Sequence, residues 1–321
     1  MSKRLSLFIR IAVSISLIML LFWIMRDKFS DIISELSQTN LILFFTAFLM
    51  FCLNIVFLSL RLDWIMAGEG LKLPFRSLVE LNFIGYFFNN FMPSAVGGDI
   101  VKAYYIGKHN KQKMKSYMSV FMDRYIGLLS FAAIAFIALL ISWNFVKDPL
   151  IKKVVLFFFL GCLCFLFVSL NRQAEKIISK LLKKFKFFNL GEKLHKVFLV
   201  VHDYRNKMPI IYKTFLVSIA AQVVYVFIVL ILFNAIHTDV GFKNVLLIMP
   251  IVSVISMLPS IGGLGLREGS IVALFGSITG NDKAFSVGIL LFALLLFVSI
   301  IGGIMYFRSP LLKGLDLTDK N

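Results

Sequence analysis

The strings PSAVGG at residues 93–98 and PSIGG at residues 259–263 each interrupt a long apolar stretch, one in each half of the chain. In lipid, a broken helix leaves backbone N–H and C=O groups without partners, and each such group costs several kcal/mol. Breaks are therefore tolerated only where the backbone is buried in protein or lines a wet cavity. Paired interruptions at corresponding places in two halves are typical of a transporter's substrate site. We interpret Pro93 and Pro259 as the breaks that decide the fold.

The composition is that of a membrane protein. The 321 residues are 59% hydrophobic and 16% charged, and the mean hydropathy is +0.89, whereas soluble domains are less apolar and more highly charged. The sequence predicts an all-α integral membrane protein with one polytopic domain over residues 1–321. The first apolar window ends without a small-residue cleavage site, so we expect a retained helix rather than a signal peptide. A span needs about 20 apolar residues, and the candidate windows are 5–25, 41–60, 117–142, 154–170, 211–236 and 284–307.

The positive charges are unevenly spread along the chain. With the N-terminus placed in the cytoplasm, 25 of the 34 Lys and Arg residues fall in cytoplasmic segments and seven in outside segments, leaving Arg124 and Arg267 at membrane depth. By the positive-inside rule, this predicts a multi-pass protein of the cell membrane with both termini in the cytoplasm. The net charge of +17 therefore orients the chain and does not indicate nucleic-acid binding. The segments counted as cytoplasmic are 1–10, 61–77, 102–115, 171–213 and the tail from 308.

The apolar runs around the two breaks are too short to span a membrane. Runs 78–92 and 99–106 flank the first break, and runs 245–258 and 268–277 flank the second. Each pair is interpreted as a re-entrant helical hairpin, the first entering from the cytoplasm and the second from outside. The prediction is about six transmembrane helices plus two re-entrant hairpins in an inverted-topology repeat. The half-repeats cover about 41–170 and 211–307, and the hairpin tips are expected to meet near the membrane midplane.

Residues 171–210 join the two halves. Their apolar residues recur at helical spacing, with Lys176, Lys180, Lys183 and Lys184 on the other side. This pattern predicts a basic amphipathic helix on the anionic cytoplasmic leaflet. The alternative is a solvated basic loop that only sets the topology.

Ionisable and amide side chains gather around both breaks. Because a charge inside a membrane is costly, such groups usually face a cavity or one another. In a structural interpretation, Asp99 pairs with Arg124, and Arg267 with Glu268 or Asp123, only to hold helices together. We favour a substrate site, because charges flank both breaks. The candidates are Asn89, Asn90, Ser94, Asp99, Lys102, Asp123, Arg124, Arg267 and Glu268.

Glycines follow each break and precede a short apolar helix. They are Gly97 and Gly98 in the first half, and Gly262, Gly263 and Gly265 in the second. A helix N-terminus offers free N–H groups and a positive dipole end, which suits phosphate, and glycine lets a ligand approach the backbone. Arg267 would add a bidentate clamp on the phosphate. The alternative is that these glycines only form tight turns or close helix contacts.

Signatures of enzymes are missing from the sequence. There is no Asp-x-Asp pair, no Gly-x-Ser-x-Gly elbow and no Walker loop. The four histidines fall in predicted loops without a helix-spaced partner, and the three cysteines lie in apolar spans. We therefore expect no cofactor, no metal site and no enzymatic activity.

Three motifs carry a resemblance to a known family. GYFFNNFMPSAVGGDIVKAY at 85–104, DRYIGL at 123–128 and PSIGGLGLREG at 259–269 resemble, in order, signatures of the lysylphosphatidylglycerol synthase transmembrane-region family of flippase-like membrane proteins. The resemblance implies a cell-membrane protein with a flippase-type role for lipids that carry a polar head group. Members that make lysyl-phosphatidylglycerol carry a soluble aminoacyl-transfer domain after the membrane part. These 321 residues do not include one, so we do not expect a synthase.

The leading hypothesis is a lipid translocase. The helix N-termini after Gly98 and Gly265 would meet a phosphate-containing head group, and Arg124 and Arg267 would offset its charge. The lipid would be an anionic phospholipid, an aminoacyl-phospholipid or a polyprenyl-phosphate-linked sugar, which a partner enzyme would supply. One alternative is a membrane enzyme or accessory subunit of polyprenyl-phosphate sugar or aminoacyl-lipid metabolism, with Asp99 or Glu268 as its base. A small-solute transporter is the other, since repeat architecture does not determine function.

Overall fold

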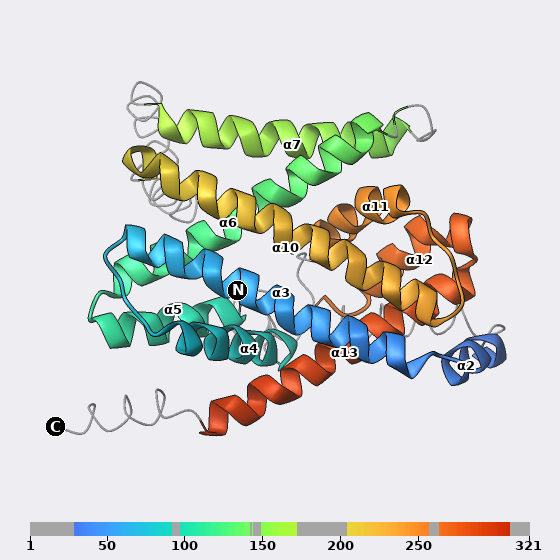
Figure 1. The fold of residues 1–321 in the computed structure, drawn as a ribbon. Helices are drawn as coiled ribbons and strands as arrows, with labels where there is room; N and C mark the ends of the chain where they lie inside the picture. The colour runs from blue at the N-terminus through green and yellow to red at the C-terminus, as the bar shows by residue number, and fades with distance from the viewer. Residues whose placement is uncertain are drawn as a thin grey trace, which may run out of the picture.

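The computed structural model describes residues 29–91, 97–141, 143, 149–171, 204–256 and 263–308. These residues form a bundle of helices joined by turns (Figure 1), and the chain is an all-α membrane protein. The helices in chain order are α2 (Phe29–Ser37), α3 (Leu41–Gly68), α4 (Phe75–Phe91), α5 (Gly97–Asn110), α6 (Lys113–Ile141), α7 (Pro149–Leu170), η3 (Tyr204–Lys207), α10 (Met208–Ala235), α11 (Phe242–Ile255), α12 (Leu266–Thr279) and α13 (Asn281–Arg308).

Four of the described helices are long and apolar enough to cross a membrane. They are α3, α6, α10 and α13, each 28 or 29 residues long, and they contain the predicted spans 41–60, 117–142 (through residue 141), 211–236 (through residue 235) and 284–307. The predicted span 154–170 lies within α7, and the predicted span 5–25 lies outside the described residues. One boundary differs from the prediction. α3 continues past residue 60 to Gly68, so that Arg61 is a helix residue and not a loop residue.

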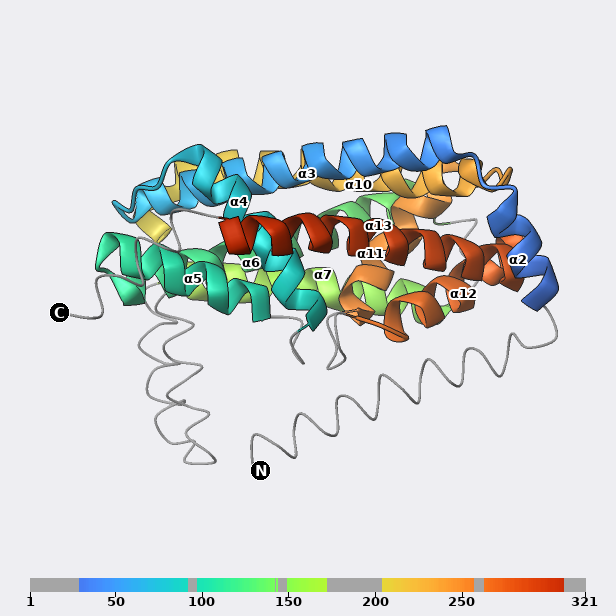
Figure 2. The same cartoon turned by 90° about the horizontal axis from the view of Figure 1, so that it is seen from below.

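The short helices flank the two breaks as the sequence predicts. α4 has 17 residues, and α5, α11 and α12 have 14 each, all below the roughly 20 residues of a membrane span. The α4–α5 pair begins and ends at one end of the bundle, and the α11–α12 pair begins and ends at the other (Figure 2). This arrangement is the one a re-entrant hairpin requires. The break residues Pro93, Ser94, Pro259 and Gly262, and most of the predicted amphipathic segment 171–210, lie outside the described residues.

Local chemistry sets several helix ends. Asn40 caps α3, because its side-chain Oδ1 accepts hydrogen bonds from the N–H groups of Ile42 (3.0 Å) and Leu43 (3.2 Å). Gly265 precedes α12 and Gly280 follows it, with φ angles of 79° and 89° that favour glycine.

At the other end of α3, Glu69 accepts from Lys207 Nζ at 2.6 Å. This ion pair fastens η3 to the bundle beside Tyr204, whose phenol has a raised pKa because it is buried.

The helices form two series of the same order, long, short, short and long. α3 and α10, the first helices of the two series, lie side by side and antiparallel (Figures 1 and 2). α4 packs on α13 of the other series, and α11 packs in the corresponding way on α6. Each series therefore covers the first short helix of the other, and the largest apolar core joins residues of both.

Glycines allow two of these helix crossings. A Cβ on Gly98 of α5 would lie 2.0 Å from the carbonyl oxygen of Gly85 in α4. A Cβ on Gly302 of α13 would lie 2.0 Å from the carbonyl oxygen of Phe83, also in α4. The backbones therefore approach closely, as small residues permit between membrane helices, and α4 is held on two sides.

We expect Gly302→Ala to destabilise the protein by at least about 1–3 kcal/mol, which is the usual cost of overpacking a core. Thermal unfolding in detergent measures this loss. Gly161→Ala in α7 is the matched control, because a Cβ there has nothing within 4 Å, and its melting temperature should equal or exceed that of the wild type. Equal stability of the two variants would contradict the close α4–α13 crossing.

Candidate functional site

A cavity of about 290 Å³ lies where the two series of helices meet. All four helices of each series contribute to its lining, and the short helices α4 and α5 face it together with α11 and α12. The two short-helix pairs therefore converge on one polar space. The hairpin tips, which are predicted to meet near the midplane, lie outside the described residues.

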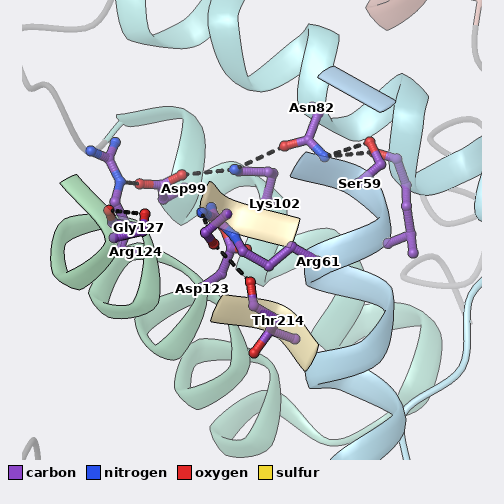
Figure 3. A network of polar contacts seen from close by, with 12 residues as sticks. Ser59, Arg61, Asn82, Asp99, Lys102, Asp123, Arg124, Gly127 and Thr214 are labelled. Carbon is purple, nitrogen blue, oxygen red and sulfur yellow. Dashed lines mark hydrogen bonds and ion pairs between the residues drawn. The ribbon is translucent and has the colours of Figure 1, made fainter. Parts of the chain in front are cut away.

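Asp99, in the first turn of α5, is the centre of one ion-pair network (Figure 3). Its carboxylate accepts from Lys102 Nζ at 2.9 Å and from Arg124 Nε of α6. Lys102 also donates to Asn82 Oδ1 at 3.2 Å, and Asn82 in turn donates to Ser59 Oγ at 2.9 Å. The network thus joins α3, α4, α5 and α6, and the carboxylate also lies at the favourable positive end of the α5 dipole.

Asp123 and Arg61 form a second, bidentate ion pair between α6 and α3. Arg61 Nε and NH2 donate to the two carboxylate oxygens of Asp123 at 2.6 and 2.9 Å, and its NH1 donates to Ser218 Oγ of α10 at 3.1 Å. Gly127 lies one turn after Asp123, and a Cβ there would come within 2.9 Å of Arg61 NH1. The glycine makes room for the guanidinium, so one side chain holds α3, α6 and α10 together.

Arg267 and Glu268 form the third pair, at the start of α12. Arg267 Nε and NH2 donate to Glu268 Oε1 at 3.0 and 2.5 Å, while Glu268 Oε2 accepts from the N–H of Gly265 at 2.8 Å. Glu268 therefore caps its own helix. The Arg267 guanidinium lies 5.9 Å from the ring centre of Phe292, and the residue lines the cavity.

The charge of the lining is unbalanced. Among the described residues, Arg61, Lys102, Arg124 and Arg267 line the cavity, but only two carboxylates do. The carboxylates, Asp99 and Asp123, are each 5% exposed, whereas the Arg124 side chain is 30% exposed. Glu268, which lies outside the lining, offsets the charge of Arg267, and Arg124 is the most exposed of the four cations.

The structure places the predicted site residues in three groups. Those that line the cavity are Asn89, Asn90, Asp99, Lys102, Asp123, Arg124 and Arg267. Gly97, Gly98, Gly263, Gly265 and Glu268 are described but are not part of the lining. Ser94 and Gly262, with Pro93 and Pro259, lie outside the described residues.

The predicted N-terminal N–H groups have side-chain partners in this structure. Gly98 donates to Asn89 Oδ1 at 2.8 Å, as Gly265 donates to Glu268. Gly98 also makes the close contact with α4 described above. Gly98 thus has a packing function, and Gly265 a conformational one, because its φ of 79° favours glycine. Ligand binding at either N–H would have to displace a side-chain oxygen.

Sequence reasoning missed Arg61. Because the hydropathy window ends at residue 60, Arg61 is counted there as a cytoplasmic loop residue, yet it is 6% exposed and lines the cavity. A usable signal was present, since Asn54 lies seven residues earlier and therefore on the same helix face. Asn54 also lines the cavity, as do Gln222 and Tyr225 of α10.

Apolar helices around buried ion pairs and a polar cavity define an integral membrane protein with an intramembrane polar site. The chain belongs to the lysylphosphatidylglycerol synthase TM region family, whose model matches residues 7–303. It is 27% identical over 234 residues to a UPF0104 membrane protein of Methanothermobacter thermautotrophicus, covering 66% of this chain and 68% of the relative. A UPF0104 membrane protein of Pyrococcus horikoshii is 25% identical over 136 residues, which are 41% of this chain and 40% of that protein. The family predicted from the three motifs is confirmed.

Asp123→Asn should destabilise the fold by about 3–5 kcal/mol, because it leaves the buried Arg61 guanidinium without a charged partner. Unfolding in detergent measures the change. Combining Arg61→Met with Asp123→Leu removes both charges and should recover most of the loss. A double variant that is no more stable than Asp123→Asn would show that the pair does not act as a unit.

Proposed function

We propose that the protein is a flippase-like transporter that moves a lipid with a phosphate-containing head group between the leaflets of the cell membrane. The observation that carries the proposal is the excess of cations around a cavity that both short-helix pairs line. An anionic head group entering this cavity exchanges water for guanidinium and ammonium donors, while its hydrocarbon chains stay in an apolar environment.

Ligand exchange at Asp99 supplies a mechanism. Asp99 has two cationic partners, Lys102 and Arg124, so a phosphate can take Arg124 without leaving the carboxylate unpaired. Arg267 can also reach a phosphate in the cavity, but at a higher cost, because Glu268 would then keep only its hydrogen bond from Gly265. The ion pairs thus hold the empty cavity together and become phosphate ligands when lipid is present.

The substrate class follows from the same charges. An anionic phospholipid or a polyprenyl-phosphate-linked sugar would engage the cations, and an aminoacyl-phospholipid would add an ammonium group for Asp99 or Asp123. In this proposal the lipid is not changed chemically, and a partner enzyme supplies it. The proposal also places both chain termini in the cytoplasm, which the excess of Lys and Arg in those segments supports.

The test is leaflet reorientation in liposomes containing the purified full chain. Head-group-labelled phosphatidylglycerol, aminoacyl-phosphatidylglycerol and polyprenyl-phosphate sugar are offered separately, and accessibility to a membrane-impermeant quencher is followed. We expect the protein to move at least one of them, and Arg124→Gln and Arg267→Gln to lower the rate per folded protein at least tenfold. Arg124→Gln should stay folded, because Asp99 keeps its ion pair with Lys102, whereas Arg267→Gln should also lose stability, because Glu268 is buried without another cation. Arg76→Gln is the matched control, because the Arg76 side chain is 91% exposed outside the cavity.

The outcomes separate the candidate functions. Chemical conversion of a lipid by the purified protein would replace the proposal with the membrane-enzyme alternative. Uptake of a solute without movement of any lipid would replace it with the small-solute transporter. Lipid movement that is equal in Arg124→Gln, Arg267→Gln and the wild type would overturn the role of the cavity.

A further inference from the structure

A second cavity, of about 370 Å³, is lined by apolar side chains only. It lies between α6, α7, α11 and α12, where its lining includes Ala135, Val154, Phe158, Ile251, Val254 and Leu274. Figure 1 shows α7 along the outer side of α6. Val154 is 47% exposed at the rim, so the cavity borders the lipid-facing surface.

The two cavities share a pair of helices. Phe131 of α6 lines the polar cavity, and Ala135 lines the apolar one. These residues are four positions apart, so they lie on one helix face about 6 Å apart along the axis. Ser253 of α11 and Ser256, which directly follows this helix, belong to the polar lining, whereas Ile251 and Val254 of α11 belong to the apolar lining. The seam between α6 and α11 therefore leads from the charged site to hydrocarbon.

The counterpart seam between α4 and α13 is fastened. Asn90 donates to Ser299 Oγ at 2.5 Å, and Ser299 donates to the carbonyl oxygen of Tyr86 at 3.1 Å. The close backbone contact between Gly302 of α13 and Phe83 of α4 adds tight packing between these two helices, so separating them is costly. Opening this seam would expose polar groups to lipid, which is unfavourable.

The seam between α6 and α11 has a different character. Ala135, Ala138 and Leu139 of α6 pack on Leu247 of α11 through apolar contacts. The serine hydroxyls of α11 stay within their own helix, with Ser253 bonded to the Met249 carbonyl and Ser256 to the Val252 carbonyl. Apolar contacts between helices can be exchanged for lipid contacts, because lipid chains are as apolar as the side chains.

One helix in the wall of the apolar cavity contains an internal proline. Pro250 lies inside α11 and lines this cavity. Proline has no N–H, so it removes one hydrogen bond of the helix, and it favours a kink. α11 can therefore bend where it separates the two cavities.

We propose that the apolar cavity holds a hydrocarbon chain of the transported lipid, and that the α6–α11 seam is where the polar cavity opens sideways. The proposal rests on the proposed function, because it places the chain of the lipid whose head group occupies the charged site. α7 covers the outer side of the seam and shields the chain from bulk lipid.

The test is photo-cross-linking of the full chain in phosphatidylcholine liposomes. The probes are phosphatidylglycerol with a diazirine in its acyl chain and, in parallel, a polyprenyl phosphate with a diazirine in its chain. Adducts are mapped by mass spectrometry to the apolar cavity and to Leu49 and Val56, which face outward on α3. Unlabelled lipid of the same head group then replaces part of the phosphatidylcholine, with the probe fraction held constant.

For at least one probe we expect cavity adducts to fall fivefold or more under this competition, while α3 adducts stay constant. If neither unlabelled lipid reduces the number of cavity adducts, the adducts come from bulk lipid, and the proposal is overturned. Competition at α3 instead of the cavity would overturn it as well.

Filling the cavity gives an independent readout. Val254→Trp places a large side chain in the apolar cavity, and Val56→Trp is the matched control on the outward face of α3. We expect lipid reorientation to fall at least tenfold in Val254→Trp and to stay near wild type in Val56→Trp. If Val254→Trp moves lipid at the wild-type rate and unlabelled lipid does not reduce the cavity adducts, the apolar cavity does not hold the lipid chain. The transporter proposal would still stand. If the wild type moves no lipid, the transporter proposal fails, and the adducts alone decide whether this cavity binds a chain.

Discussion

The cost of placing charge among apolar helices governs this structure. Among the described residues, each Lys, Arg and Asp side chain that lines the cavity has an opposite charge within hydrogen-bonding distance, because an unpaired charge inside a membrane is expensive. The bidentate pair of Arg61 and Asp123 connects the first and last helices of one series, and its bond to Ser218 reaches the other series. The pairs therefore determine which helices can lie together at the polar cavity, and the apolar core packs around them.

The pairing is also what makes a transport function physically reasonable. An arginine whose ion pair cannot separate cannot bind a substrate. Asp99, however, has two cationic partners, and Glu268 has both a cation and a backbone N–H as partners. Asp99 can release Arg124 and keep its ion pair with Lys102, whereas Glu268 would keep only the hydrogen bond from Gly265. An anionic head group can thus be exchanged for an internal carboxylate at small net cost, which is what a substrate that must both enter and leave requires.

The two series have the same helix order but do not have equivalent contacts. Asn90 and Ser299 fasten α4 to α13, whereas α6 meets α11 through small and branched apolar side chains. Such an asymmetry gives a symmetric architecture one preferred place to open. Among the described helices, α7 packs on the outer side of α6.

Hydropathy and charge were sufficient to predict much of the architecture. A segment inserts into lipid as a helix when its own residues are apolar, which is a local property of the sequence. Four spans, the two pairs of short helices and the family were predicted from runs of apolar residues and the two Pro-Ser motifs. The same reasoning placed Arg61 and Lys102 in cytoplasmic segments, although both are buried at the cavity. A window average treats each charge as solvated. Lys102 is buried beside Asp99 of its own helix, and Arg61 is buried beside Asp123 of a helix distant in sequence.

The sequence by itself thus determined the membrane class, the helical composition, the breaks and most of the charged candidates, since these follow from the polarity of neighbouring residues. Only the tertiary structure decided which charges pair, as with Arg61 and Asp123, which are 62 residues apart. It also decided that Gly98 packs against Gly85 and that the apolar cavity adjoins the charged one. These features depend on distances between helices, which no local property of the chain contains.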